Sequence, residues 1–406
     1  MGFCAIISLI IGEKSMANFE KLIRDLTAYM SKNLTEEDGT LTKDSAKINA
    51  VEKVIIKYID DNPGIETYKD STYGLSLGMW AAMYGLEDVV LKALEAKKST
   101  FQTTDYQGYG GYNLGMFAAK HGMLRATLKA LEDTDASIQQ NDIGQNIGMI
   151  AADAKMEIAV IKASKNLYAA TQQDRLGQNI GMYAVQNKLT KAACESLNNS
   201  VAAVQQDING DTIGIMAARL GLENVVDKVF GDSIAVRQFN KKGENIVLMC
   251  AESGNIRALM RTFDDKELIT EFQQAFSKSK YEFVEELLMR GNDDVREAVV
   301  NRLIKDYPSL LDGNVILTIA RTCPENTIID VIKSVPRARM HQDRMTGDNI
   351  GMITAKRGFE KATLFACKSK TAVKQKDKGG MTILDYAKQR KLKSVIQFLQ
   401  SNNNVM

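Results

Sequence analysis

The chain has 406 residues, 45% of them hydrophobic and 25% charged, which is the composition of a folded protein rather than a disordered one. Its five cysteines are dispersed and it has only two histidines, so neither a disulfide framework nor a zinc site is expected. We therefore expect reduced thiols in a cytoplasmic compartment, with no metal and no cofactor.

The net charge of +2 is unevenly distributed. Residues 337–406 carry 15 Lys and Arg against 5 Asp and Glu, a net charge of +10, whereas the preceding residues carry a net charge of −8. Such a split indicates attraction to an acidic protein segment, a membrane or a nucleic acid. The alternative is a terminal cap whose charge serves only solubility.

Residues 1–16 form an apolar N-terminal extension that we expect to lie outside the fold. The apolar stretch at 3–10 is far shorter than the ~20 residues that span a bilayer, and no Lys or Arg precedes it as in a secretory signal. Acylation of Cys4 and a translation start at Met16 are the two interpretations of this segment. Residues 17–65 are predicted to form an N-terminal helical cap, with helices at 18–31 and 43–61.

From residue 66 onward one phrase, Asn-Ile-Gly-Met, recurs at a fixed pitch. It is complete at 146–149, 179–182 and 349–352, with variants at 77–79, 113–116 and 212–215. One further glycine marks each unit, at Gly74, Gly111, Gly144, Gly177, Gly210, Gly243, Gly347 and Gly380. Most of these glycines are 33 residues apart, and such a period predicts stacked supersecondary units.

Each unit has the same order of features. An Asp or Asn about three residues before the glycine predicts an Asx turn. An Asn or Thr two residues after it predicts a helix N-cap. Alanine pairs follow in the first helix, and a second helix has a branched apolar face.

This order of features resembles the ankyrin repeat over roughly residues 66–401. The residues that carry the resemblance best are Asp207, Gly210, Thr212, Ala217, Ala218 and Gly221 in one unit, and Asp377, Gly380, Thr382, Leu384 and Ala387 in another. The resemblance implies an all-α, ankyrin-like repeat solenoid with short inter-repeat loops. Repeats are expected at 66–254, and C-terminal repeats with a cap at 341–401, before a disordered tail at 402–406.

The chain departs from the family where Ile-Gly-Met replaces Pro-Leu-His. A glycine inside a helix costs about 1 kcal/mol relative to alanine, so we interpret Gly-Met as a packing column where neighbouring helices approach closely. Two further columns are predicted. A glutamine ladder joins the loops, at Gln139, Gln172, Gln205, Gln238, Gln342 and Gln375. A column of large side chains fills the core, at Trp80, Phe117, Ile150, Tyr183, Met216, Met249, Ile353 and Tyr386.

Residues 255–340 lack the loop signature but keep helical patterns at 268–289, 295–304, 315–322 and 328–334. We interpret them as degenerate helical repeats, with a small inserted domain as the alternative. No phosphate-binding GxxxxGK[ST] loop and no convergent catalytic set is present. His121 and His341 are expected in solvated loops, and a Cys323–His341 dyad has no further support. The chain is therefore predicted not to be an enzyme, the alternative being a cryptic catalytic site within 255–340.

The resemblance implies that a partner protein binds to the concave face and the loop tips. The positions transferred from it are Tyr73, Leu75, Met83, Tyr84, Tyr106, Tyr109, Tyr112, Lys120, His121, Arg175, Arg219, Lys356, Arg357 and Arg390. This face is aromatic at its N-terminal end and basic at its C-terminal end, where an acidic segment is expected to bind.

The predicted function is a protein–protein interaction scaffold or adaptor with no integral membrane span. It is expected in the cytoplasm, or in a host-cell cytosol if it is a delivered microbial effector. The further alternative is peripheral membrane or nucleic-acid binding through the basic segment at 337–406.

Overall fold

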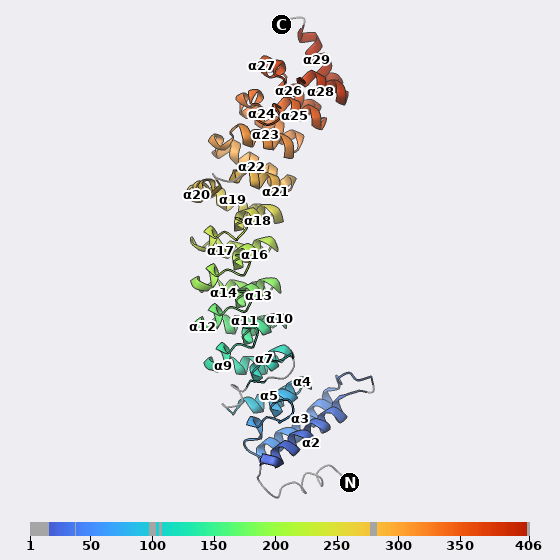
Figure 1. Ribbon diagram of the computed structural model, residues 1–406, viewed down its shortest axis with the longest axis vertical. Helices are drawn as coiled ribbons and strands as arrows, with labels where there is room; N and C mark the ends of the chain where they lie inside the picture. Colours follow the sequence, from blue (N-terminus) through green and yellow to red (C-terminus); the bar gives the residue numbers. More distant parts are fainter. Residues whose placement is uncertain (1–15, 37, 97–102, 105–107, 277–281, 404–406) are drawn as a thin grey trace. The chain divides into compact units, whose positions relative to one another are not determined.

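The computed structural model describes residues 16–36, 38–96, 103–104, 108–276 and 282–403. The chain divides into two compact units, here called unit 1 (Met1–Met216 with Asn240–Lys242) and unit 2 (Ala217–Phe239 with Gly243–Met406). In the described residues every regular element is a helix, and extended backbone is limited to isolated bridges (Figure 1). The all-α prediction is confirmed.

Unit 1 begins with the helical cap α2 (Met16–Leu34) and α3 (Ser45–Asp61), close to the predicted helices. Their buried faces include Ile23 and Met30 on α2 and Val51 and Ile55 on α3. α3 packs on the first repeat, and its Glu52 Oε1 accepts the Asp88 N–H at 2.9 Å. The cap therefore covers the apolar side of the first repeat.

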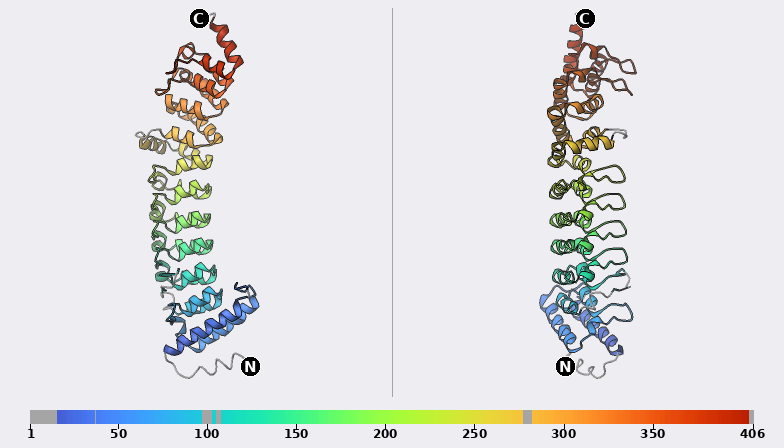
Figure 2. Two further views of the ribbon diagram at one scale, coloured as in Figure 1. Left: turned by 45° about the vertical axis from the view of Figure 1, so that its right-hand side comes forward. Right: turned by 90° about the vertical axis from the view of Figure 1, so that its left-hand side faces the viewer.

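The repeats of unit 1 form two rows of helices behind a set of loops. After η1 (Ile65–Thr67), the first helices are α4 (Leu77–Met83), α7 (Leu114–Lys120), α10 (Ile147–Asp153), α13 (Ile180–Gln186) and α16 (Ile213–Arg219). The second helices are α5 (Glu87–Leu94), α8 (Leu124–Ala130), α11 (Glu157–Ser164) and α14 (Thr190–Ser196). Successive first helices contact one another, as do successive second helices. Figure 2 shows the loops of unit 1 projecting from one side of the helices.

A short third helix, which was not predicted from the sequence, follows the second helix in several repeats. In unit 1 these helices are α9 (Thr134–Ile138), α12 (Leu167–Thr171) and α15 (Ser200–Val204). Each begins at an Asp or Asn whose side chain accepts backbone N–H groups, as Asn166 does from Ala169 at 3.3 Å. The third helix connects the second helix to the next loop.

Unit 2 contains helix pairs in the same two-row arrangement. Its first row is α18 (Ile246–Ser253), α21 (Phe283–Arg290), α23 (Gly313–Thr322), α25 (Ile350–Arg357) and α28 (Ile383–Arg390). Its second row is α17 (Glu223–Val229), α19 (Ile256–Asp264), α22 (Asp293–Asp306), α24 (Glu325–Ser334), α26 (Glu360–Ala366) and α29 (Lys393–Asn403). The remaining elements are η2 (Ala235–Arg237), α20 (Lys266–Phe276), η3 (Pro308–Leu310), η4 (Pro336–Met340) and α27 (Lys370–Lys374).

The single helix expected at 268–289 is therefore divided. α20 ends at Phe276 and α21 begins at Phe283, with residues 277–281 outside the described part of the chain. One helix was predicted because the apolar pattern of the sequence continues from 268 to 289 without interruption.

The asparagine of the recurring phrase joins the first helix of a repeat to the short third helix. Asn146 Oδ1 accepts the Met149 N–H at 3.1 Å as an N-cap, as predicted. Its Nδ2 donates to Ala169 O in α12 at 3.0 Å and to Gln172 Oε1 just after α12 at 2.9 Å. The equivalent bonds recur at Asn113, Asn179 and Asn349.

The predicted glutamine ladder is present in part. Gln172, Gln205 and Gln375 accept from these asparagines and donate to the last carbonyl of the short helix in the preceding repeat, in α9, α12 and η4 respectively. Gln342 differs, because its amide donates to Gly347 O at 2.7 Å and Lys376 O at 3.0 Å. The turn here is one residue longer, so a position counted from its glycine falls in another column.

The glycine of the phrase is a packing position, as predicted. A Cβ atom on Gly148 would lie 2.6 Å from Ile180 Cδ1 and 2.7 Å from Ala163 Cβ. The isoleucine of one phrase thus packs on the glycine of the preceding phrase. Met149 and Met182 beside them are fully buried.

Candidate functional site

The loops of unit 1 are rigid turns held in register with one another. Asp174 Oδ1 accepts the N–H groups of Leu176 and Gln178, both at 2.8 Å, while Gly177 adopts the left-handed conformation at φ 75°. Adjacent loops are joined by backbone bonds: Arg175 N–H donates to Ile143 O at 3.0 Å and Ile208 N–H donates to Leu176 O at 2.9 Å. A side chain at a loop tip therefore sits on a fixed support.

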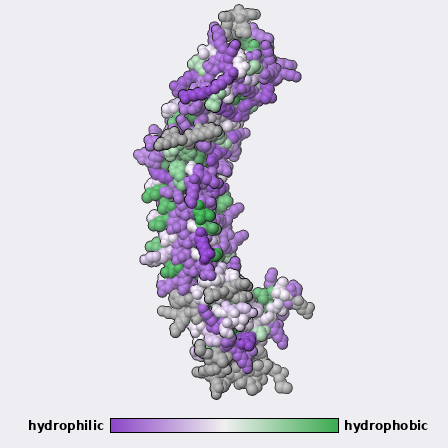
Figure 3. Space-filling view, in the orientation of Figure 1, coloured by the Kyte–Doolittle hydropathy of each residue, from purple (hydrophilic) through white to green (hydrophobic). Residues whose placement is uncertain are grey.

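Large side chains are exposed at four of these tips. They are Tyr73 (45% exposed), Ile143 (49%), Leu176 (50%) and Ile208 (52%), which we call the tip row. Figure 3 shows hydrophobic surface over the repeats around α11–α14. Tyr73 and Arg175 were predicted from the sequence as binding residues, but the three aliphatic residues were not. Their signal was available, since each stands one or two residues before a turn glycine, where polar residues are usual.

The face of the first helices that turns toward the loops lies beside the tip row. The Tyr183 hydroxyl on α13 donates to Asp174 Oδ2 at 2.8 Å and accepts from Gln145 Nε2 at 2.9 Å. Burial, reinforced by the Asp174 carboxylate, raises the pKa of Tyr183, so the hydroxyl stays protonated. One turn later on the same face, Asn187 Nδ2 donates to Asp153 Oδ1 at 3.2 Å in the preceding repeat.

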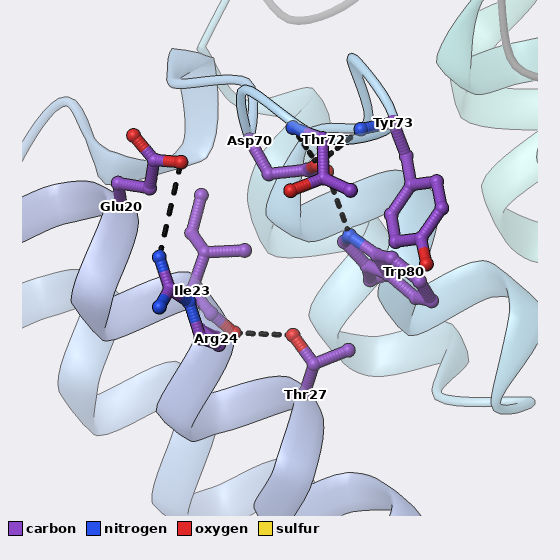
Figure 4. A pocket seen from close by; sticks show the side chains of 8 residues that line it. All are labelled: Glu20, Ile23, Arg24, Thr27, Asp70, Thr72, Tyr73 and Trp80. Carbon is purple, nitrogen blue, oxygen red and sulfur yellow. Dashed lines mark hydrogen bonds and ion pairs between the residues drawn. The ribbon is translucent and has the colours of Figure 1, made fainter.

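A pocket of about 150 Å³ lies at Tyr73, between the cap and the first repeat (Figure 4). α2 contributes Ile23 and Arg24, the loop contributes Asp70, and α4 contributes Trp80. Asp70 Oδ2 accepts the Trp80 indole N–H at 3.0 Å, and the Tyr73 ring packs edge-on against Trp80 at 5.7 Å. The pocket could therefore accept an apolar side chain of a partner against Ile23 and Trp80, with Arg24 and Asp70 beside it.

The second repeat has an aromatic cluster. Tyr109 stacks on Phe117 with ring centroids 4.7 Å apart, and His121 stacks against both rings at 6.4 Å. Desolvation of the His121 ring and the charge of Lys120 lower the pKa of this histidine, although its side chain remains exposed. Tyr112 is buried, and the predicted Tyr106 lies outside the described residues.

Three of the transferred positions are taken up by the fold. Leu75 is fully buried, because the residue after the turn glycine points inward. Lys356 pairs with Asp348 at 2.6 Å and lies over the Tyr386 ring at 4.4 Å. Arg357 donates to Ala320 O at 2.8 Å and Cys323 O at 2.7 Å at the end of α23. Leu75 therefore does not belong to an accessible surface, and the two cations are already partnered.

The transferred positions at the end of α4 and the remaining transferred cations are accessible to different extents. Met83 and Tyr84 are half-buried at the end of α4. Arg219 is exposed and pairs with Glu244 at 3.5 Å. The exposed positions with no ion pair in the described part of the chain are Lys120, Arg175 and Arg390.

Unit 2 ends in a strongly basic surface that we call the basic end. Its exposed members are Lys361, Lys368, Lys370, Lys374, Lys376, Lys378, Lys388, Arg390, Lys391 and Lys393. The nearby acids are used within the fold. Asp377 accepts from the Tyr386 hydroxyl, Asp385 closes a capping box with Thr382, and Glu360 accepts the Ser394 N–H at 2.7 Å.

The catalytic candidates of 255–340 do not converge. Cys323 is fully buried, and burial raises the pKa of its thiol to about 11. His341 instead lines a cavity of about 440 Å³ with Asp312 and Arg337, where the Asp312 carboxylate already caps α23. Among the described residues no group of His, Cys, Asp or Glu is arranged to hold a metal ion. None of the helices described is both long and apolar enough to cross a membrane.

Comparison with known proteins identifies no family. No family model matches the chain, and no curated protein matches it. Among solved structures it is similar to the ankyrin repeat domain of Bcl-3, described as a unique member of the IkappaB protein family. That likeness covers 55% of this chain and 92% of the other, with 14% identity and a TM-score of 0.40. By its stacked helix pairs and projecting loops, the chain has an all-α, ankyrin-like repeat fold.

Proposed function

We propose that this chain is a scaffold or adaptor that binds a partner protein across the tip row and the adjoining face of the first helices in unit 1. The supporting observation is the tip row itself. Large apolar side chains stand half-exposed one or two residues before the turn glycine in three successive repeats, at Ile143, Leu176 and Ile208. Apolar anchors on a rigid support are typical of binding surfaces, because little conformational entropy is lost when they bind.

Where the protein acts is also part of the proposal. We infer a reducing compartment, either its own cytoplasm or the cytosol of a host cell into which it is delivered. Cys250, Cys323 and Cys367 are free buried thiols, which agrees with such a compartment.

Substitution of the tip row is expected to abolish capture of the partner. In the variant Ile143→Asp, Leu176→Asp, Ile208→Asp, each charge replaces an exposed apolar side chain, so the fold is expected to persist. Proteins captured by the wild-type chain from a lysate, quantified by mass spectrometry, are expected to fall at least tenfold, since one anchor contributes about 1–2 kcal/mol.

The matched control is Ile158→Asp with Leu167→Asp, at residues that are 61% and 68% exposed on α11 and α12. This variant adds charge to exposed apolar positions elsewhere in the same repeats. It is expected to capture the wild-type set. Equal capture by the tip variant and the wild-type chain would contradict the proposal.

A second candidate function is binding of an acidic segment by the basic end. It is supported by the excess of cations, since residues 337–406 carry 15 Lys and Arg against 5 Asp and Glu. Lys374→Glu, Lys376→Glu and Lys378→Glu together are expected to weaken binding of a polyglutamate peptide at least tenfold in low salt. Preferred binding of anionic vesicles or of single-stranded RNA over that peptide would favour the membrane or nucleic-acid alternative.

A further inference from the structure

Three lysines occupy a backbone conformation that L side chains rarely adopt. Among the described residues they are the non-glycine positions with positive φ: Lys155 (57°), Lys188 (59°) and Lys391 (58°). Each lies in the turn between the first and second helix of its repeat. The same place in other repeats is held by Gly85, Gly122, Gly221, Gly254 and Gly358, all with positive φ. Strained positions of this kind concentrate at functional sites.

The fold itself makes no use of the Lys155 and Lys188 side chains. Both are exposed, and neither forms an ion pair in the part of the chain that is described. The turn is held by their backbone N–H groups, which donate to Ala152 O at 2.9 Å and Val185 O at 3.0 Å. A glycine would supply the same N–H without strain. What the lysines add is charge.

These two lysines belong to the repeats whose tips present Ile143 and Leu176. Between tip and lysine run α10 and α13, each of 7 residues. Such a helix is about 10 Å long, close to the 10–12 Å diameter of an α-helix with its side chains. The Tyr183–Asp174 bond turns the face of α13 toward the loops. Each of the two repeats thus has an apolar tip, a helix face and a cation in that order.

We propose that this strip binds an amphipathic α-helix of the partner, acidic along one edge and running across successive repeats of unit 1. The proposal rests on the function proposed above and names the form of the bound segment. Ile143, Leu176 and Ile208 hold its apolar residues. Lys155 and Lys188 pair with its Asp or Glu side chains.

The spacing of the repeats favours a helix over an extended chain. Packed helix layers are about 8–10 Å apart, and seven residues of an α-helix rise about 10.5 Å. At the upper end of that range, an apolar residue at every seventh position falls opposite one tip after another. There an extended chain, whose side chains on the same side lie about 6.6 or 13 Å apart, misses the spacing by about 3 Å at each tip. Three tips require about two heptads.

Charge complementarity determines which charge is expected along the edge of the bound helix. Asp153 on the helix face accepts from Asn187 Nδ2 at 3.2 Å and forms no ion pair with either lysine among the described residues. Lys155 and Lys188 therefore stand exposed and available to a carboxylate of the partner. An acidic edge is therefore attracted to this side of the strip, and a basic one is repelled.

The probes for the test are three fluorescein-labelled peptides of 21 residues. Two share leucines at heptad spacing and carry either Glu or Lys along one edge. The third has the composition of the Glu peptide in scrambled order. In fluorescence polarisation with the full chain, the Glu peptide is expected to bind at least tenfold more tightly than the other two. Lys155→Glu with Lys188→Glu is expected to reverse the preference toward the Lys peptide.

Two further variants separate binding from folding. Lys155→Gly with Lys188→Gly is expected to raise the midpoint of thermal unfolding, because backbone strain is relieved. The same variant is expected to bind the Glu peptide at least fivefold more weakly. Lys165→Glu, at an exposed lysine at the end of α11 that belongs to neither proposed surface, is expected to leave peptide binding unchanged. Equal binding of the Glu and scrambled peptides, or a preference that the charge reversal leaves unchanged, would overturn the helix proposal. In that case, loss of lysate capture by the tip-row variant would still support the proposed function, because that experiment does not depend on the form of the bound segment.

Discussion

Replacing Gly181 by alanine is expected to destabilise unit 1, although alanine is the better helix former. A Cβ atom at this position would lie 2.3 Å from Ile213 Cδ1 and 2.8 Å from Ser196 Cβ. Helix propensity alone predicts a gain of about 1 kcal/mol. Overpacking costs about 1–3 kcal/mol and more when the neighbours cannot move. Both neighbours are buried, so we expect a net loss of about 1–2 kcal/mol in urea denaturation.

The double variant Gly181→Ala, Ile213→Val is the control for this packing argument. Valine lacks the Cδ1 methyl that the new Cβ would meet. On its own, Ile213→Val costs about 0.5–1.5 kcal/mol. With Gly181→Ala it is expected to cost less, giving a favourable coupling of about 1 kcal/mol. A Gly181→Ala variant more stable than the wild-type chain would contradict the packing role of the glycine column.

Asn179→Asp is expected to have the largest effect on stability. Asn179 Oδ1 accepts the Met182 N–H at 3.0 Å, and a carboxylate preserves this cap. The amide Nδ2, however, donates to Ala202 O at 3.0 Å and Gln205 Oε1 at 2.9 Å. A carboxylate would face these two oxygens with no proton while fully buried. We expect a loss of about 3 kcal/mol or more at neutral pH.

The loss is expected to depend on pH in a defined direction. Burial and the facing oxygens raise the pKa of the new carboxyl in the folded state above its unfolded value of about 3.9. The variant is therefore most stable, relative to wild type, at pH values below both pKa values. Its deficit grows as the pH rises above the unfolded value and levels off above the folded value. Urea denaturation of both proteins at several pH values measures this difference.

Asn245→Asp is the matched control for the two hydrogen bonds that Asn179 Nδ2 donates. Asn245 is also fully buried and caps its helix by accepting the Leu248 N–H at 2.9 Å. Its Nδ2, however, is buried without a hydrogen-bond partner among the described residues. The substitution breaks no hydrogen bond donated by Nδ2, so a smaller loss is expected. Equal losses at 179 and 245 would show that burial of the charge, and not loss of the Nδ2 bonds, accounts for the effect.

The repeat fold could be predicted because its signals are local. The turn glycines, the N-caps and the glycine packing column all follow from residues within one 33-residue unit. The hydrogen bonds that Asn146 Nδ2 donates could not be predicted, since nothing in the sequence pairs this asparagine with the glutamine column or with the carbonyl of Ala169 in the unpredicted third helix. The short helix α12 was also missed, because five residues are too few to display a helical period.

The candidate site was predicted less well than the fold. Counting from a family pattern placed Leu75 outward, whereas the close packing of this turn buries it. Lys356 was read as a free cation, but its partner Asp348 is eight residues earlier in a different element. Ile143, Leu176 and Ile208 were missed because apolar residues are ordinarily assigned to the core. Their place one or two residues before a turn glycine was the signal that could have identified them as exposed.

Photo-crosslinking at a loop tip tests the central claim most directly. p-Benzoylphenylalanine in place of Leu176 reports on the tip row, and in place of Ile158 it reports on an equally accessible position of α11. After irradiation in a lysate, we predict that the chain labelled at 176 forms a discrete adduct with the captured partner and that the chain labelled at 158 does not. An adduct from position 158 alone, or from neither position while the partner is still captured, would contradict binding at the tip row.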